Sequence, residues 1–271
     1  MSESGTEKKI RLIASDLDGC LMDEHGLLPG EFKEAFDLME KNDVLFAASS
    51  GRSFRGVVRP FEDIFDKIAL VSDNGARVTY KGETLYSSIL DSSDFLPVVE
   101  EMRKVKGLLP VACGEKGAYV ERRDSLDRDM EEELKKYFSS WNECSFDNIP
   151  DRIVKFAVLY FDDIEKNIYP LFKRFDNDKL CVQVTAYIWM DIYEKGISKG
   201  KGIKILQDAL KIDPSETVVF GDYLNDLDMA DYATRSFAPA NAHPEVRERF
   251  TGTIGPNTEN GVTKKIISLL S

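Results

Sequence analysis

The sequence has few histidines and no excess of positive charge. His25 and His243 are the only histidines in 271 residues, and we interpret both as surface residues. Two histidines disfavour a zinc site or a catalytic triad built around imidazole. With 48 acidic and 36 basic side chains the formal net charge is −12, so we expect no nucleic-acid partner. Carboxylates are the groups available for chemistry.

Long apolar runs and paired cysteines are also lacking. No stretch reaches the roughly 20 apolar residues that span a bilayer, and the polar start MSESGTEKK does not predict a signal peptide. The cysteines lie far apart, without the spacing of metal-binding pairs: Cys20, Cys113, Cys144 and Cys181. The sequence therefore predicts a cytoplasmic protein without a membrane partner, and we infer no obligate protein partner.

Short apolar runs alternate with helical patterns near both ends of the chain. Residues 10–16, 44–50 and 67–73 have the pattern of buried strands, and residues 30–42 have helical spacing. The same alternation of strand and helix patterns returns after Ile197. It predicts an α/β fold: a Rossmann-like, three-layer core with a parallel sheet covered on both faces, formed by residues 1–88 and 190–271.

Residues 89–189 have a different order of helix and strand patterns, which predicts an inserted α+β domain. We expect its helices to cover one face of a largely antiparallel sheet. The expected elements are helices at 92–106, 125–141 and 163–175, a hairpin at 109–121, and strands at 152–161, 179–185 and 187–193.

Four short polar motifs follow apolar strands or begin helices. They are DLDGCL (16–21), SSGR (49–52), SKGKG (198–202) and GDYLND (221–226). In open α/β sheets the binding crevice lies beyond the carboxyl ends of the strands. We therefore expect Asp16, Asp18, Ser50 and Asp222 to converge there, with Lys199 at a helix N-terminus facing the same crevice.

The residue types in these motifs suit phosphoryl transfer. Three converging aspartates form an oxygen site of the kind that holds Mg²⁺. A serine, backbone N–H groups and a lysine suit a phosphate. A carboxylate nucleophile beside Mg²⁺ and a lysine fits transfer through an aspartyl-phosphate. The pair Asp16 and Asp18 alone would fit a solvated turn better than a catalytic site, so the joint pattern carries this hypothesis.

The motif order and the inserted domain resemble the haloacid dehalogenase (HAD) superfamily, in particular Cof-type phosphatases of subclass IIB with a C2B cap. The resemblance covers nearly the whole chain and includes the segments NGA (74–76) and GISKG (196–200). It implies that Asp16 is the nucleophile and that Asp18 is the acid and base. It also implies that Asp16, Asp222 and the backbone carbonyl of Asp18 bind Mg²⁺.

The resemblance assigns further residues to the phosphate. Ser50 and the amide of Gly51 would bind the transferring phosphoryl group, Lys199 would neutralise it and Asn225 would reach it. Asp226 would hold the metal ligands or Lys199 in position without binding the phosphate itself.

Two positions depart from the family pattern. Cys20 stands where Thr or Val is usual, and we interpret it as a small core residue with a modest effect. The segment APANA (238–242) lacks the usual glycine before its Asn–Ala pair, which leaves a role for Asn241 open.

These observations favour a Mg²⁺-dependent phosphatase, a phosphoric monoester hydrolase that acts on small phosphorylated metabolites such as sugar phosphates. The alternative is a phosphotransferase or phosphomutase that uses the same aspartyl-phosphate. A receiver-like switch is disfavoured, because receivers have a different acidic pair and no inserted cap. We expect the cap to select the substrate, with Tyr187 and Asp191 as candidate specificity residues.

Overall fold

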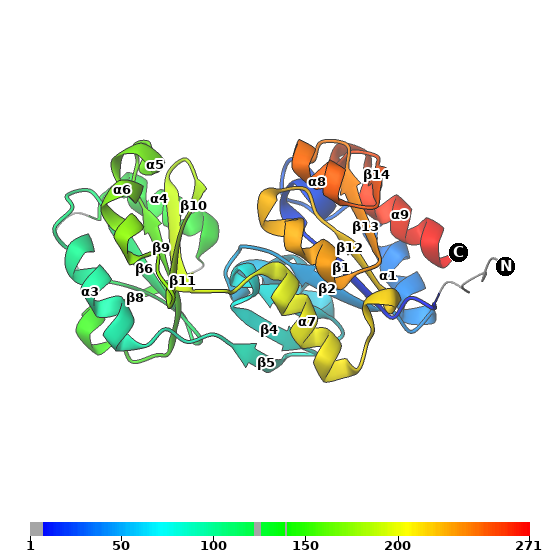
Figure 1. Cartoon of the computed structure of the whole chain (residues 1–271), viewed down its shortest axis with the longest axis horizontal. Coiled ribbons are helices and arrows are strands. Elements are labelled where there is room, and N and C mark those ends of the chain that lie inside the picture. Colours follow the sequence, from blue (N-terminus) through cyan, green and yellow to red (C-terminus); the bar gives the residue numbers. More distant parts are fainter. Residues whose placement is uncertain (1–7, 122–125, 139) are drawn as a thin grey trace. The chain divides into compact units, whose positions relative to one another are not determined.

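The computed structural model describes residues 8–121, 126–138 and 140–271. It divides into two compact units (Figure 1): one runs up to Tyr86 and resumes from Ser198 to Ser271, and the other is Ser87–Ile197. The second unit includes all of strand β11 (Trp189–Glu194), because β11 pairs with strands on both of its sides. The sequence boundary at residue 190 would divide this strand.

The first unit contains an eight-stranded sheet in the order β14-β13-β12-β1-β2-β3-β4-β5. The pairs from β14 to β3 are parallel, and β4 is antiparallel to β3. Its strands are β1 (Leu12–Ser15), β2 (Leu45–Ser49), β3 (Ala69–Ser72), β4 (Arg77–Tyr80), β5 (Glu83–Ser87), β12 (Thr217–Phe220), β13 (Arg235–Pro239) and β14 (Gly252–Ile254). Because Ser15 is in register with Ala48 and Phe220, the motifs after β1, β2 and β12 emerge at one edge of the sheet.

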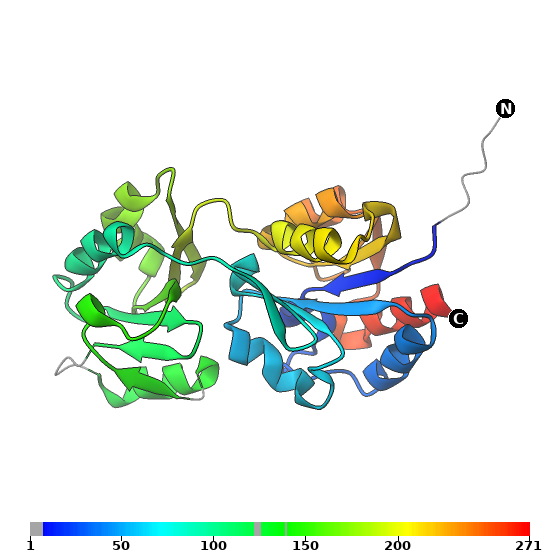
Figure 2. The same ribbon diagram turned by 90° about the horizontal axis from the view of Figure 1, so that it is seen from below.

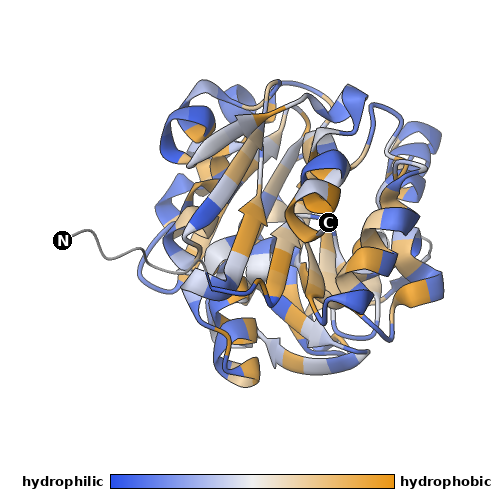
Figure 3. Cartoon of the chain, turned by 90° about the vertical axis from the view of Figure 1, so that its right-hand side faces the viewer, coloured by the Kyte–Doolittle hydropathy of each residue, from blue (hydrophilic) through white to orange (hydrophobic). Residues whose placement is uncertain are grey.

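Helices cover both faces of this sheet, as the sequence predicts. Helices α1 (Phe32–Lys41) and α9 (Gly261–Leu270) pack on the face that bears Ile13, while α7 (Lys199–Leu210) and α8 (Pro244–Arg249) pack on the face that bears Leu12. Figure 2 shows α7 on one side of the strands and α1 and α9 on the other. Figure 3 shows apolar strands between helices whose outer faces are polar. The result is a three-layer core.

The second unit contains a six-stranded sheet in the order β10-β11-β9-β6-β7-β8. All of its recorded pairs are antiparallel except β7 with β8. Besides β11, its strands are β6 (Leu109–Gly114), β7 (Ala118–Val120), β8 (Trp141–Glu143), β9 (Ile153–Leu159) and β10 (Leu180–Ala186). Its helices are α3 (Ser92–Met102), α4 (Arg128–Tyr137), α5 (Ile164–Asn167) and α6 (Tyr169–Phe172).

The helices of the second unit do not all lie on one face, contrary to the sequence prediction. Phe95 of α3 and Phe172 of α6 pack with Phe156 on one face. Leu134 of α4 packs with Ala157 on the other. Neighbouring residues of β9 point to opposite faces, and the continuous apolar run of this strand allows helices on both.

Several element boundaries also differ from prediction. The helix expected at 163–175 is divided into α5 and α6, because Pro170 can begin a helix but cannot continue one. The helix expected at 125–141 is α4; residues 125 and 139 lie outside the described residues. The pattern of residues 225–233 predicts a helix, and the structure has a 3₁₀ helix there, Leu224–Tyr232. None of the helices in the described ranges is both long and apolar enough to cross a membrane.

Candidate active site

The loop after β1 carries the two aspartates of the first motif. The N–H of Asp16 donates to the carbonyl of Phe220 (2.9 Å), which fixes this residue beside the end of β12. Gly19 has a φ of 77°, and a Cβ at this position would lie 2.6 Å from Oδ2 of Asp222. A glycine after the aspartate pair is therefore required by both the backbone conformation and the close approach of Asp222.

Three carboxylates meet around one lysine. Asp16, Asp222 and Asp226 each offer an oxygen atom within 4.8 Å of the others. The ammonium of Lys199 lies 2.6 Å from Oδ1 of Asp16 and 2.7 Å from Oδ1 of Asp226, and all three of these side chains are buried. Asp16, Lys199, Asp222 and Asp226, from three separate parts of the sequence, thus form one largely buried ionic cluster, which we call the acidic cluster.

Burial dominates the electrostatics of the acidic cluster. It raises the pKa of Asp16 well above its ordinary value against the opposing charge of Lys199, and it raises the pKa of Asp222 to about 6. Burial alone would lower the pKa of Lys199, but the charges of Asp16 and Asp226 outweigh it and raise that pKa. Three carboxylates and one ammonium leave a formal charge of −2, which a divalent cation would neutralise.

The donors of the acidic cluster fit a divalent metal. Within the described part of the chain, Oδ1 of Asp222 is buried without a hydrogen-bond partner. Both oxygens of Asp226 are already used: Oδ1 accepts from Lys199, and Oδ2 accepts from the N–H groups of Asp222 (2.9 Å) and Tyr223 (3.1 Å). The orphaned oxygen of Asp222 is thus suited to ligate a metal, whereas Asp226 is suited to orient the residues around it.

The side chain of Asp18 lies outside the acidic cluster. Its carboxylate accepts from Nε (2.8 Å) and Nη2 (2.5 Å) of Arg52, the last residue of the second motif, and it is half exposed. The carboxylate of Asp18 is therefore paired with Arg52 and is not one of the three that meet at Lys199. The sequence places Arg52 in the second motif but indicates no role for it.

The second motif begins at the end of β2 and is hydrogen-bonded to the neighbouring strand β3. The N–H of Ser50 donates to Val71 (2.8 Å), and its buried Oγ accepts from the N–H of Arg52 (3.1 Å). Nδ2 of Asn225 donates to Oδ1 of Asn74 (3.0 Å). Asn74 in turn lies against Gly51, where a Cβ would be 3.1 Å from Oδ1 of Asn74. The sequence gives Asn74 a place in the NGA segment of the family resemblance, but no role in the site.

The start of α7 is fixed from two sides. Ser198 is its N-cap and accepts from the N–H of Lys201 (3.3 Å), as predicted. The N–H of Gly200 donates to Oδ1 of Asp228 (3.3 Å). A Cβ on Gly75 would lie 2.1 Å from the carbonyl oxygen of Ser198, so the turn after β3 touches the helix start. These contacts determine where Lys199 enters the acidic cluster.

Two asparagines brace the loop of the first motif. Asn241 donates from Nδ2 to the carbonyl of Gly19 (2.8 Å) and accepts from the N–H of Asn257 (3.0 Å), whose Nδ2 donates to the carbonyl of Met22 (3.0 Å). The role that the sequence leaves open for Asn241 is therefore a backbone contact. The missing glycine before it does not prevent that contact.

The sequence predicts Cys20 in the core and both His25 and His243 on the surface, and the structure agrees except that His243 is only partly exposed. Cys20 is buried in the apolar core, and burial together with the charge of Asp16 raises its pKa, so the thiol stays protonated. His25 is exposed. His243 is partly exposed, caps α8 by accepting from the N–H of Glu245 (3.3 Å), and contacts the ring of Tyr223.

The two cap candidates have different surroundings within the second unit. Tyr187 is 66% exposed in the turn between β10 and β11. Asp191 is buried and ion-paired, with Oδ2 2.9 Å from Nζ of Lys155. Tyr187 is thus accessible to a ligand, whereas the charge of Asp191 is already neutralised.

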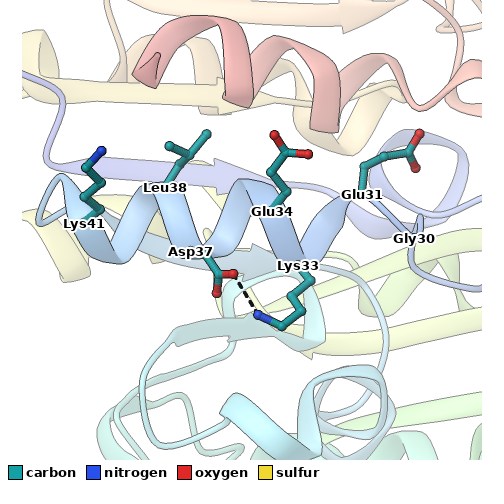
Figure 4. Close-up of a pocket in the computed structure, with 7 residues that line it drawn as sticks. All are labelled: Gly30, Glu31, Lys33, Glu34, Asp37, Leu38 and Lys41. Carbon is teal, nitrogen blue, oxygen red and sulfur yellow. Dashed lines mark hydrogen bonds and ion pairs between the residues drawn. The ribbon is translucent and has the colours of Figure 1, made fainter.

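An open hollow of about 660 Å³ lies along α1, away from the motifs (Figure 4). It is lined by Gly30, Glu31, Lys33, Glu34, Asp37, Leu38 and Lys41. None of these residues belongs to the acidic cluster, and the pair Lys33 and Asp37 is an exposed helix ion pair (2.7 Å). The reactive groups therefore lie at the acidic cluster and not in this hollow.

A family profile and several known proteins match nearly the whole chain. The profile of haloacid dehalogenase-like hydrolases matches residues 13–266. YbjI of Escherichia coli K12, named 5-amino-6-(5-phospho-D-ribitylamino)uracil phosphatase, is 28% identical over 263 residues, with 96% of each chain covered.

Solved structures share the fold. SMU.1108c from Streptococcus mutans UA159 has a TM-score of 0.85 at 22% identity, covering 97% of this chain and 99% of its own. The HAD subclass IIB sugar phosphatase BT4131 has a TM-score of 0.78 at 20% identity, covering 95% and 98%. The family profile spans both parts of the first unit and the whole insertion between them. The chain therefore belongs to the haloacid dehalogenase-like hydrolases, the superfamily that its motifs resemble.

Proposed function

We propose that this hydrolase is a Mg²⁺-dependent phosphatase of small phosphorylated metabolites, with Asp16 as the nucleophile. The observation that carries the proposal is the buried ion pair between Asp16 and Lys199, in the same cluster as Oδ1 of Asp222, which has no hydrogen-bond partner among the described residues. The names of its relatives support the reaction class. YbjI is named as a phosphatase of a phosphorylated ribityl compound, and the subclass IIB neighbour is named as a sugar phosphatase. We extend the substrate class of sugar or polyol phosphates to this chain.

In the first step, an oxygen of Asp16 attacks phosphorus while the bond to the leaving oxygen breaks. Asp18 gives its proton to that oxygen, so the product leaves as an alcohol. In the second step, Asp18 takes a proton from water as the water attacks phosphorus. This frees inorganic phosphate and restores the carboxylate of Asp16.

Positive charge and hydrogen bonds would hold the phosphoryl group during both steps. Lys199 stays charged, because the neighbouring carboxylates outweigh its burial. Ser50, the amide of Gly51 and Asn225 are the proposed donors to the phosphoryl oxygens. Asp16, Asp222 and the carbonyl of Asp18 would hold Mg²⁺, which would supply further positive charge to the phosphoryl site when bound. Asp226 orients Lys199 and the backbone around Asp222.

Phosphate release from a panel of sugar, polyol and nucleotide monophosphates tests this proposal. We expect turnover with Mg²⁺, none with EDTA, and none in Asp16→Asn with Mg²⁺. A purified, folded protein that releases no phosphate from the panel or from p-nitrophenyl phosphate would contradict it. Exchange between sugar-phosphate isomers without phosphate release would favour the phosphomutase alternative. The cytoplasmic location stays a prediction of the sequence.

A further inference from the structure

The turn after β3 contains three consecutive residues in the left-handed region of backbone conformation. The φ angles are 52° for Asp73, 55° for Asn74 and 97° for Gly75. This region is unfavourable for residues other than glycine, and Asp73 and Asn74 are both buried here. Such a turn persists only where its surroundings hold it, and conformations of this kind gather at functional sites.

Contacts on two sides hold this turn. The N–H of Asn74 donates to the carbonyl of Ser50 (3.1 Å), and the N–H of Asp73 donates to the carbonyl of Arg52 (2.9 Å). On the other side, Gly75 packs so closely on Ser198 that a side chain could not fit. The turn therefore connects the loop of the second motif to the start of the helix that carries Lys199.

The side chain of Asn74 lies between two residues proposed to bind the phosphoryl group. Its Oδ1 accepts a hydrogen bond from Nδ2 of Asn225, and its amide group fills the space in front of Gly51. The Nδ2 group of Asn225 carries two hydrogens, and this bond uses one of them. This bond fixes the plane of the Asn225 amide. It thereby also fixes the direction in which the second N–H of that amide points.

We propose that Asn74 is a positioning residue for the phosphoryl site, which orients Asn225 and keeps the surface next to Gly51 neutral. This inference rests on the proposed function. Asparagine meets both demands, since it tolerates the left-handed conformation and accepts a hydrogen bond without a charge. Aspartate has the same shape, but its negative charge would repel a phosphoryl dianion. Glycine would suit the backbone and would leave Asn225 without its acceptor.

Substitutions at Asn74 separate this role from a merely structural one. In the full-length enzyme with Mg²⁺, Asn74→Gly should keep its thermal stability, because glycine suits a positive φ. It should weaken binding of inorganic phosphate about 10-fold or more, with KM raised, since a hydrogen bond that serves a charged group is lost. Asn74→Asp should weaken phosphate binding further than Asn74→Gly. Phosphate binding is measured by calorimetry, and KM and kcat are measured with p-nitrophenyl phosphate.

Two controls make the result decisive. Asn260 is another asparagine with a positive φ (58°), and it bonds Glu31. Asn260→Gly matches the backbone change and should leave phosphate binding unaltered. In a double-mutant cycle, Asn225→Ala should lose much of its effect when Asn74 is already glycine, because the two act together.

Unchanged phosphate binding and KM in a stable Asn74→Gly variant, or additive effects in the cycle, would overturn this inference. Neither result would contradict the proposed function if the unmodified enzyme still hydrolyses phosphate esters. If the unmodified enzyme hydrolyses none, the proposed function fails. The calorimetric comparison with inorganic phosphate still decides the role of Asn74.

Discussion

Arg52 donates two hydrogen bonds to the carboxylate of Asp18, one to each of its oxygens. The two residues are 34 positions apart in sequence and come from different motifs. A bidentate pair of this kind fixes the plane and direction of the carboxylate more strictly than a single contact would. If Asp18 transfers the proton, Arg52 determines where that proton is delivered.

We therefore predict that Arg52→Gln lowers kcat about 10-fold or more for poor leaving groups, because misplaced catalytic groups lose rate steeply. The loss should be smaller for p-nitrophenyl phosphate, whose leaving group needs little protonation. Arg52→Lys should fall between, since lysine cannot form the two-point contact. Arg55→Gln, on the nearby helix α2 (Phe54–Val58), removes the same charge and serves as the control. Equal losses for good and poor leaving groups would show that Arg52 does not act through Asp18.

The two aspartates of the first motif should respond differently to amide substitution. Asp16→Asn should remove turnover, because an amide cannot attack phosphorus in the manner of a carboxylate. Asp18→Asn should slow turnover roughly 10²–10⁴-fold, with the larger loss for poor leaving groups. Steady-state kinetics on alkyl and nitrophenyl phosphates check both, with circular dichroism to confirm folding. Substantial turnover by Asp16→Asn would assign the nucleophile elsewhere.

Part of the site could be predicted from the sequence, since parallel strands bring the motifs that follow them to one edge of a sheet. That rule placed Asp16 and Asp222 near each other, and the structure brings them together with Lys199 and Asp226. Their catalytic roles stay predictions. The structure also confirms the α/β core and the α+β insertion.

The contacts that sequence reasoning missed depend on side-chain direction and on loops that approach from distant parts of the chain. Asn225 and Asn74 are 151 residues apart, and Asn241 and Gly19 are 222 apart, so no local pattern relates them. The turn residues Asn74 and Gly75 predict a tight turn, but not what it packs against. β8, α8 and β14 have three to six residues each, too few for a periodic pattern to stand out.

The pKa of Asp222 predicts how stability and metal binding depend on pH. Its folded value of about 6 lies above the ordinary value of 3.8, because burial disfavours the charged form. The folded protein therefore holds this proton more tightly than the unfolded chain. The metal-free protein should lose this share of its stability as the pH rises from about 4 to about 6.

A metal must displace that proton, so Mg²⁺ should bind more weakly at pH 5 than at pH 7.5, by roughly 10-fold for each pH unit below the pKa of Asp222. Thermal unfolding with and without Mg²⁺ at the two pH values measures the effect. Asp222→Asn should remove most of the stabilisation by Mg²⁺ at pH 7.5. Equal stabilisation of the unmodified protein at both pH values would argue against Asp222 as a ligand.

Gly19 should tolerate no side chain. In Gly19→Ala the new Cβ would meet Oδ2 of Asp222, and the backbone would be held at an unfavourable positive φ. We expect the variant to fold with lower stability and to lose most of its Mg²⁺ affinity and turnover, because either Asp222 or the loop must move. Gly30→Ala provides the matched control, since a Cβ there meets no atom within 4 Å. Full activity in Gly19→Ala would mean that the approach of Asp222 to this loop is not needed.

Two residues of the inserted unit, Tyr187 and Asp191, should respond differently to substitution: one in substrate preference and the other in stability. Tyr187 is exposed in a turn, so Tyr187→Ala should leave stability and the hydrolysis of p-nitrophenyl phosphate nearly unchanged. If the insertion selects the leaving group, this variant should change the ranking of kcat/KM among sugar phosphates. Asp191→Asn instead breaks the buried ion pair with Lys155, and breaking such a pair typically costs about 3–5 kcal/mol.

The effect of Asp191→Asn should therefore appear first as a lower unfolding temperature of the second unit. Replacing both members of the pair, as Lys155→Met with Asp191→Leu, should recover most of the lost stability, because both buried charges of the pair are then removed together. Differential scanning calorimetry and a substrate panel on the same preparations separate the two roles. A changed substrate ranking in the stable double variant would assign the pair to substrate selection. An unchanged ranking in both this variant and Tyr187→Ala would place specificity in other residues.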